Sequence, residues 1–288
     1  MNPANAIIEC VHGGIFCIVQ YPGEKIIHRS RDEFGDLVVT ESALVRSLYF
    51  GNEKRQSAMF LQHSGLLVME YTQAMMLALL FRRKPEKVFC LGLGGGSIAK
   101  FILRASPRVI LDVVELREMV IRVAQAYFAV PADDCRLRLI HGDGYRYFGG
   151  EHDQGVDYDL MFLDAFDHEG PVDRVSNLSF IEKAYLRLDE RGVLCINLWN
   201  RSGDGFHQKL RQLKSLCGGA VLHNEIGRRN SNALIFCFKQ REMMLQLRRY
   251  EAVSNDLRRE FGINFHKYYS RLYKQNVPVM QRLFKAAV

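Results

Sequence analysis

From residue 87 to residue 199, short apolar runs alternate with segments of helical composition, and this alternation constrains the fold more than any other feature of the sequence. The runs are apolar at nearly every position, which is typical of strands buried on both faces of a sheet. Parallel strands connected by helices meet this condition. The pattern therefore predicts a doubly wound α/β domain, with strands in KVFCLGL, RVILDVVEL, LRLIHGD, YDLMFLDAF and GVLCINLW. Two later runs, GGAVLHNEI and NALIFCF, predict an antiparallel pair that closes the sheet.

Short β-type runs broken by glycine and proline precede this domain. AIIECV, IFCIVQY, KIIHR and DLVVT predict a small antiparallel sheet, and AMFLQHSGLLV predicts a further hairpin around Ser64 and Gly65. The segment 71–81 lacks glycine and proline and is rich in Ala, Leu and Met, so it predicts one helix that ends before Pro85. We therefore expect a small β-domain over residues 1–69, an α/β domain over residues 70–240 and a helical tail over residues 241–288.

The formal net charge is +7, and almost all of the excess lies in the tail. From Gln240 to Val288, ten Lys or Arg residues stand against four Asp or Glu residues, a net of +6. Such a tail can bind nucleic acid or an acidic partner, or it can be a helix with solvated basic side chains. We expect the second, with the tail packed on its own domain or on a neighbouring subunit and no binding to nucleic acid at physiological salt.

Seven scattered cysteines without a C-x-x-C pair predict buried thiols in a reducing compartment. No uncharged apolar stretch reaches the roughly 18 residues of a transmembrane helix. The N-terminus lacks the features of a signal peptide, and the nine histidines show no metal-ligand spacing. We therefore expect a cytoplasmic protein without a metal site.

The stretch LGLGGGSIAK, residues 91–100, lies where the first strand of the α/β domain is predicted to end and a helix to begin. Its glycines are Gly92, Gly94, Gly95 and Gly96. Glycines let the backbone turn tightly and approach a ligand, and a helix N-terminus offers free N–H groups. Glu115 ends the next apolar run, where a carboxylate can hold the two hydroxyls of a ribose. Glu115 can also stabilise the start of the following helix. The glycine loop and Glu115 together favour a nucleotide-type ligand.

HGDG, residues 141–144, follows the third predicted strand. Asp143 and Gly144 lie where methyltransferase-type sheets recognise an adenine amino group, although Asp143 can equally be the N-cap of a helix that starts near Tyr145. The loop reads G-x-G-G-G rather than the G-x-G-x-x-G of a nicotinamide site. The glycine loop, Glu115 and Asp143 together resemble the S-adenosylmethionine-binding fold.

FLDAFDHEGP, residues 162–171, places Asp164 and Asp167 just beyond the fourth strand, where such folds carry substrate chemistry. The two aspartates form either a turn or a pair of carboxylates aimed at a ligand. The stretch D-A-F-D-H-E-G-P resembles the D-x-x-D-P-x-G-P signature of the spermidine/spermine synthases, the polyamine aminopropyltransferases, with His168 in place of the first proline.

The resemblance covers nearly the whole chain, from a Phe34-Gly35 turn and a tyrosine, Tyr71, at a helix entry to the late GVLCIN strand. It implies a Rossmann-like, seven-stranded methyltransferase-type α/β sheet with a small N-terminal antiparallel β-domain and a helical C-terminal tail. It implies aminopropyl transfer to a polyamine such as putrescine by a homodimer. The co-substrate is decarboxylated S-adenosylmethionine or S-adenosylmethionine, with no tightly bound cofactor.

The resemblance also assigns roles to residues. Asp164 would accept the proton of the attacking amine, while Asp167 and Tyr71 would help to orient the same nitrogen. The nucleoside would be bound by the glycine loop, Glu115, Asp143 and Gly144.

Two positions depart from the family pattern. The family loop reads G-G-G-D-G, and its Asp contacts the aminopropyl amine, whereas this chain has Gly95. The family helix entry reads Y-H-E-M, whereas this chain has Thr72 and Gln73 after the tyrosine. Each lost charge-assisted contact costs about 1.5–3 kcal/mol, so the chain resembles a divergent member of the family. Methyl transfer to an unknown acceptor, and a catalytically silent binding protein that uses the basic tail, are the alternatives.

Overall fold

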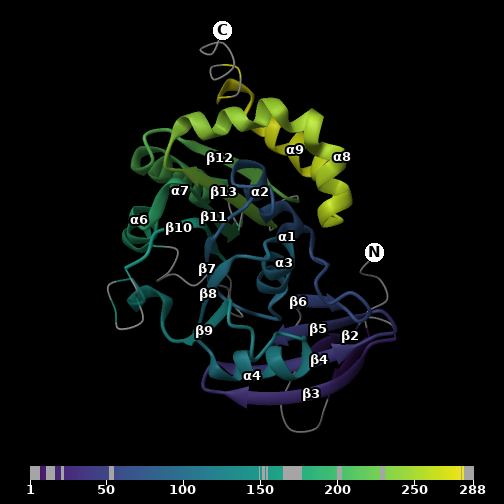
Figure 1. Cartoon of the computed structure of the whole chain (residues 1–288). Coiled ribbons are helices and arrows are strands. Elements are labelled where there is room, and N and C mark those ends of the chain that lie inside the picture. The colour runs from purple at the N-terminus through teal and green to yellow at the C-terminus, as the bar shows by residue number, and fades with distance from the viewer. Residues whose placement is uncertain are drawn as a thin grey trace.

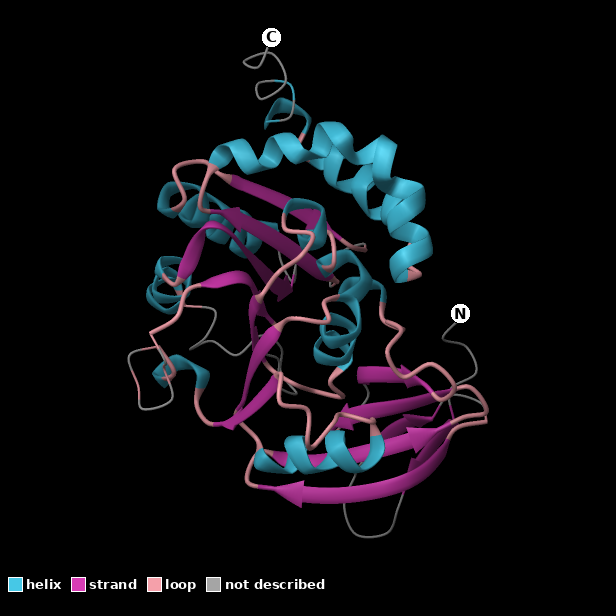
Figure 2. Cartoon of the chain, in the orientation of Figure 1, coloured by secondary structure: helices cyan, strands magenta, loops and turns pink. Residues whose placement is uncertain are grey.

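The computed structural model describes residues 7–10, 17–20, 23–51, 55–148, 150, 153, 155–164, 177–199, 203–227, 231–279 and 281. A seven-stranded sheet runs through the molecule, a four-stranded sheet lies at one end of it, and the tail helices lie at the other end (Figure 1). Helices cover both faces of the larger sheet (Figure 2). Within the described ranges, no helix is long and apolar enough to cross a membrane.

The larger sheet has the strand order β12-β13-β11-β10-β7-β8-β9. Its strands are β7 (Lys87–Leu91), β8 (Ile110–Glu115), β9 (Leu137–His141), β10 (Tyr158–Leu163), β11 (Leu188–Trp199), β12 (Val221–Glu225) and β13 (Asn232–Phe238). β7 to β11 are parallel, and β13 is antiparallel to both β11 and β12. This confirms the predicted parallel sheet with its antiparallel closing pair. Sequence order reverses between β7 and β10, and ligands of such sheets bind in the crevice at this point.

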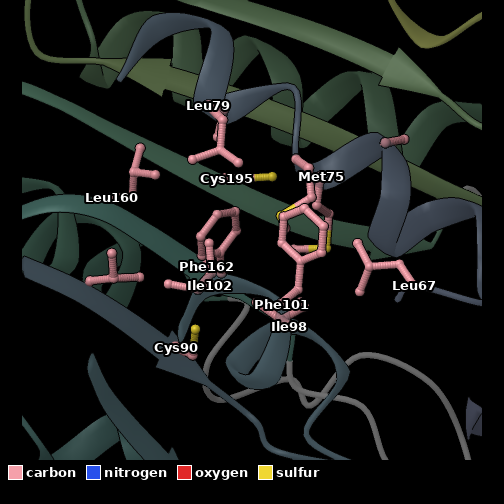
Figure 3. Close-up of a cluster of buried hydrophobic side chains, with 14 of the residues drawn as sticks. Leu67, Met75, Leu79, Cys90, Ile98, Phe101, Ile102, Leu160, Phe162 and Cys195 are labelled. Atoms are coloured by element: carbon pink, nitrogen blue, oxygen red, sulfur yellow. The ribbon is translucent and has the colours of Figure 1, made fainter. Parts of the chain in front are cut away.

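Alternate residues of each strand enter separate cores on the two faces of the sheet, which explains why the runs are apolar throughout. On β10, Phe162 enters one core and Met161 the other. In the first core, Phe101 of a covering helix lies with Phe162 and Cys90 of the strands (Figure 3). The first core is covered by α1 (Glu70–Met75), α2 (Ala78–Phe81), α3 (Ser97–Ala105) and α4 (Glu118–Tyr127), and the second by α6 (Leu178–Leu186) and α7 (Gly203–Leu216). The cysteines with described side chains are free thiols and are buried as predicted, except Cys135.

The single helix predicted over residues 71–81 is wrong, because the chain bends between α1 and α2. Met76 ends α1, and the N–H groups of Leu79 and Leu80 donate to carbonyls only three residues earlier. Every side chain from Ala74 to Leu79 is fully buried, with α1 packed on β13 and α2 on β11. Burial on all sides, which composition does not reveal, stabilises the bend over a straight helix.

The N-terminal sheet is antiparallel, as predicted, with the order β3-β4-β5-β6. Its strands are β3 (Lys25–Asp32), β4 (Gly35–Glu41), β5 (Val45–Phe50) and β6 (Arg55–Phe60). The earlier strands β1 (Ile7–Cys10) and β2 (Cys17–Gln20) form a separate pair rather than part of this sheet.

The turn predicted at Ser64 and Gly65 is present, but the hairpin predicted for AMFLQHSGLLV is reduced to one bridge. Its first half belongs to β6, which pairs with β5, and Met59 in this half makes a single antiparallel bridge with Leu67. The chain turns where the N–H of Leu66 donates to the carbonyl of His63, and it enters α1 at Glu70. Too few extended residues therefore remain for a strand.

The basic tail packs on the chain's own α/β domain, which confirms the packing expected for it. It contains η3 (Arg241–Arg249), α8 (Tyr250–Phe261) and α9 (Phe265–Gln275). Its described buried side chains are Met243, Met244, Leu247, Leu257, Phe261, Ile263, Phe265, Tyr268, Leu272 and Asn276. Side-chain amides also cover the outer edge of β12: Asn276 bonds both backbone groups of His223, and Gln275 bonds both of Glu225. A strand edge that would otherwise expose free backbone groups is thereby closed.

Candidate functional site

The glycine loop follows β7 at the switch point of the sheet. Gly92, Gly94 and Gly96 have φ of +89°, +52° and +65°, values that an L side chain rarely adopts. A Cβ at Gly96 would in addition lie 2.2 Å from Cγ2 of Val130. The loop thus requires glycine at these three positions to pass from β7 into α3.

Substitution of Gly96 by Ala tests this requirement. We expect Gly96→Ala to lower the free energy of unfolding by about 2–4 kcal/mol, because it adds backbone strain and a clash with Val130. Gly205→Ala is the matched control. Gly205 lies in α7, and no atom lies within 4 Å of a Cβ added there. This substitution should therefore raise the free energy of unfolding by about 0.5 kcal/mol. Both free energies of unfolding are measured by urea denaturation. A Gly96→Ala protein as stable as the Gly205→Ala protein would contradict the requirement for glycine at position 96.

Glu115 ends β8 and lies beside the loop. One carboxylate oxygen, Oε2, accepts from the N–H of Leu93 (2.8 Å), and Oε1 accepts from the N–H of Arg117 (3.0 Å). Burial raises the pKa of Glu115, and these N–H bonds oppose the rise. The Arg117 side chain is in turn held by both carboxylate oxygens of Asp32 at the end of β3 (2.7 and 3.0 Å). Glu115 therefore joins the glycine loop to the start of α4.

Asp143 follows β9 and caps a short helical turn, η2 (Gly144–Arg146), by accepting from the N–H of Tyr145 (2.9 Å). The capping alternative for Asp143 is thus present in the structure. Gly144 packs directly on β7, since a Cβ there would lie 2.1 Å from Cδ1 of Leu91. The loop after β9 therefore lies against the strand that leads into the glycine loop.

Asp164 lies immediately after β10, next to the glycine-loop strand, with its N–H bonded to the carbonyl of Leu91 (2.9 Å). Its Oδ2 accepts from the hydroxyl of Tyr71 (3.2 Å), and its Oδ1 accepts from Nδ2 of Asn197 (2.7 Å). Burial raises the pKa of Asp164 to about 6, while the bonds from Asn197 and Tyr71 act in the opposite direction. The result is a carboxylate poised to take up a proton near neutral pH.

Tyr71 lies in the first turn of α1, and its hydroxyl donates to Oδ2 of Asp164. Burial, and then the neighbouring carboxylate, raise the pKa of Tyr71 well above its ordinary value. Tyr71 therefore keeps its proton and acts as a donor. The structure brings together Tyr71 and Asp164 as the sequence predicted, whereas Asp167 lies outside the described residues.

Two asparagines of this site did not emerge from the sequence. Asn197 lies on β11, is 3% exposed and donates to Asp164, and Asn232 on β13 donates to Oδ1 of Asn197 (3.0 Å). The sequence feature that could have identified Asn197 is its position as a polar amide within the apolar run GVLCINLW. A polar side chain in a buried strand needs a partner, and here the partner is the carboxylate of Asp164.

The residues at the divergent helix entry are engaged elsewhere. Oγ1 of Thr72 donates to the carbonyl of Met69 (2.8 Å). The Gln73 amide donates to the carbonyl of Leu67 (2.8 Å) and accepts from the hydroxyl of Tyr268 in α9 (2.9 Å). Both side chains therefore stabilise local structure and the docking of the tail.

Comparison with known proteins agrees with this geometry. Residues 69–201 match the family model described as the spermine/spermidine synthase domain. A protein of Chromobacterium violaceum named polyamine aminopropyltransferase is 28% identical over 260 residues, which are 89% of this chain and 96% of that relative. The eEF1A lysine and N-terminal methyltransferase of Danio rerio is 31% identical over 122 residues, or 40% of this chain and 18% of that protein.

The fold has a solved counterpart in a spermidine synthase in complex with the transition state analogue AdoDATO. The TM-score is 0.60 at 15% identity, and the match covers 82% of this chain and 88% of that one. The family-model match spans the glycine loop, Glu115 and Asp164 alike, and the relative from Chromobacterium violaceum aligns over almost its whole length. Residues 69–201 of the chain are accordingly similar to the spermine/spermidine synthase domain, and the alignment with the relative from Chromobacterium violaceum extends this similarity over most of the chain.

Proposed function

We propose that this chain transfers an aminopropyl group from decarboxylated S-adenosylmethionine to a polyamine such as putrescine. The observation that carries the proposal is the Asp164 carboxylate at the switch point, with its pKa raised to about 6 and both oxygens held by donors. The relative named polyamine aminopropyltransferase, which aligns along nearly its whole length, supports the same activity.

Asp164 performs the proton transfer in this scheme. A protonated amine cannot attack carbon, so Asp164 takes a proton from the acceptor nitrogen. The freed lone pair forms a C–N bond to the propyl carbon next to the sulfonium, the C–S bond breaks, and its electron pair leaves a neutral thioether on sulfur. Tyr71 and Asn197 hold the carboxylate in line for this step. The negative charge also attracts a cationic polyamine.

The nucleoside part of the donor is assigned to the strand ends beside Asp164. The glycine loop permits close approach of the ligand, Glu115 accepts from the ribose hydroxyls, and Asp143 with Gly144 borders the adenine. In this scheme the donor is a co-substrate that leaves after each turnover. Asp167 assists acceptor binding.

A direct assay tests the function. Purified protein is incubated with putrescine or spermidine and with either decarboxylated or intact S-adenosylmethionine, and the products are identified by mass spectrometry. We expect spermidine and a thioether nucleoside from putrescine and the decarboxylated donor. Absence of a polyamine product from both acceptors would end the aminopropyl proposal.

Methyl transfer to an unknown acceptor is the second candidate. Position 95 carries no acid, and Thr72 and Gln73 are bonded to backbone or tail groups, so the polar groups that mark aminopropyl transfer in the family are reduced here. The partial match to a methyltransferase of Danio rerio points in the same direction. In the same assay, a methylated acceptor formed with the intact donor alone would favour this candidate.

The assembly and location form a further part of the proposal. We infer a cytoplasmic homodimer, as the family resemblance implies, that does not bind nucleic acid. Sedimentation at low micromolar concentration distinguishes a dimer from a monomer.

The pH dependence of the reaction follows from the raised pKa of Asp164. The base must be ionised, so kcat/KM should fall as the pH decreases through about 6. Asn197→Leu removes a hydrogen bond that holds this pKa down, so the same limb should move to higher pH. Only the acidic limb of the profile should move, because it reports the pKa of Asp164. The pKa of the acceptor amine is not changed by the substitution. A profile that is identical in both proteins would contradict the role of Asp164 as base.

A further inference from the structure

The helix that carries Tyr71 is too short to fix its own position. α1 spans six residues, Glu70–Met75, and it follows Met69, whose side chain makes no capping hydrogen bond. An isolated helix of this length is unstable in water, because few hydrogen bonds offset the ordering of its first turn. Contacts from other parts of the chain must therefore hold this turn, and with it the hydroxyl that donates to Asp164.

The tail helix α9 contacts α1 at the first and fourth residues of α1. The hydroxyl of Tyr268, a residue that is 2% exposed, donates to Oε1 of Gln73 (2.9 Å). Oε1 of Glu70 lies 3.0 Å from Nζ of Lys267 and 3.2 Å from Nη1 of Arg271. The hydrogen bond from Tyr268 contributes more than these ion pairs, because the ion pairs are partly exposed and are screened by water.

α9 is itself fixed to the sheet. Leu272 is fully buried in the first core, where Tyr268 also lies. Asn276 and Gln275, at the end of the helix, bond the outer edge of β12. The tail therefore connects the edge of the sheet to the helix that donates to Asp164.

We propose that the tail positions the base of the proposed reaction: Tyr268 holds α1 in place, so that the hydroxyl of Tyr71 stays on Asp164. Tyr268 is a positioning residue in this scheme, because it acts through α1. The inference rests on the proposed function, in which Asp164 accepts a proton. It also gives basic residues of the tail a partner within the chain, the carboxylate of Glu70.

The consequence for Asp164 has a definite sign. The hydrogen bond from Tyr71 lowers the pKa of Asp164 against the effect of burial, so a displaced Tyr71 would let this pKa rise further above about 6. Among the described residues, the titratable groups that interact with Asp164 are Tyr71, Cys90 and Cys195, and burial raises the pKa of each. These three groups stay protonated near pH 6, so a titration at this pH reports Asp164.

Tyr268→Phe removes only the hydroxyl, and the titration of Asp164 in the ligand-free protein measures the effect. We expect the pKa of Asp164, followed by carboxyl carbon NMR and assigned by its absence in Asp164→Asn, to rise by about 0.5. In a Tyr71→Phe background, Tyr268→Phe should not change this pKa, because the hydrogen bond through which it acts is already gone. An unchanged pKa in the single variant, or an equal rise in both backgrounds, would overturn the proposal.

The pH dependence of kcat/KM separates positioning from a loss of stability. For Tyr268→Phe, the loss should be about two- to threefold larger at about pH 5.5 than at about pH 8, where Asp164 is ionised in both proteins. An equal loss at both pH values would reflect a smaller folded fraction and would overturn the positioning role. Arg259→Ala is the control from the same tail, because Arg259 pairs with Asp256 of its own helix (2.6 Å). We expect it to match the wild type at both pH values.

The two readouts distinguish this inference from the function on which it rests. An active wild-type protein whose Asp164 titration is unchanged by Tyr268→Phe overturns the role of the tail alone. A wild-type protein that forms no polyamine from either acceptor overturns the proposed function, and the catalytic consequence falls with it. The ligand-free titration then still decides whether Tyr268 holds Tyr71 on Asp164.

Discussion

Asp164→Asn is expected to lower kcat by roughly 10²–10⁴, because the amide keeps the shape of the side chain but cannot accept a proton. Asn197 can still donate to the remaining carbonyl oxygen, so the position of the side chain at residue 164 is preserved. The affinity for the nucleoside should stay within about twofold of the wild-type value, since Asp164 lies on a different strand end from Glu115. Steady-state kinetics and calorimetry on the same preparation measure both quantities.

The stability of this variant separates a catalytic from a structural aspartate. Because the folded protein raises the pKa of Asp164 to about 6, it disfavours the ionised form, and Asp164 costs stability at pH values above this pKa. Asp164→Asn removes that cost, so its thermal midpoint at about pH 8 should equal or exceed that of the wild type. A lower midpoint with surviving activity in the folded fraction would indicate that the two aspartates form a turn.

Asp167→Asn, the companion variant, should act mainly on the KM of the acceptor.

Glu115→Ala is expected to weaken binding of an adenosyl ligand at least about tenfold, measured by calorimetry. The substitution removes the ribose acceptor and also frees the N–H groups of Leu93 and Arg117, which Glu115 holds at 2.8 and 3.0 Å. Both effects weaken the site, the first by a lost contact and the second by a looser glycine loop.

Two further variants apportion the effect of Glu115. Glu115→Gln keeps one carbonyl oxygen for the loop and replaces the other with a donor, so it should lose less affinity than Glu115→Ala. Glu118→Ala is the control, because Glu118 is a nearby exposed acid whose carboxylate pairs with Arg122. We expect no change in affinity there. Wild-type affinity in Glu115→Ala, or an equal loss in Glu118→Ala, would remove Glu115 from the nucleoside site.

Local sequence pattern was sufficient for the sheet and for the edge of the sheet on which the candidate site residues lie. Apolar runs that are buried on both faces define parallel strands, and parallel strands present their carboxyl ends along one edge. The glycine loop, Glu115, Asp143 and Asp164 each follow such a run, so their common edge could be predicted from the chain alone. Spacing did not reveal the bend at Met76, because a helix-forming composition is compatible with either one helix or two short ones.

The rest of the site depends on contacts between segments that are far apart in the chain. Asn197 reaches Asp164 only because β11 pairs with β10, and Tyr268 engages Gln73 only because the tail docks beside α1. The sequence by itself determined the strands, the glycine loop and the acid at each strand end, since these follow from local periodicity and backbone preference. The tertiary structure alone decided that Ser57 fills the space at Gly95 and that two donors hold Asp164, because packing and hydrogen bonding join side chains that no local pattern relates.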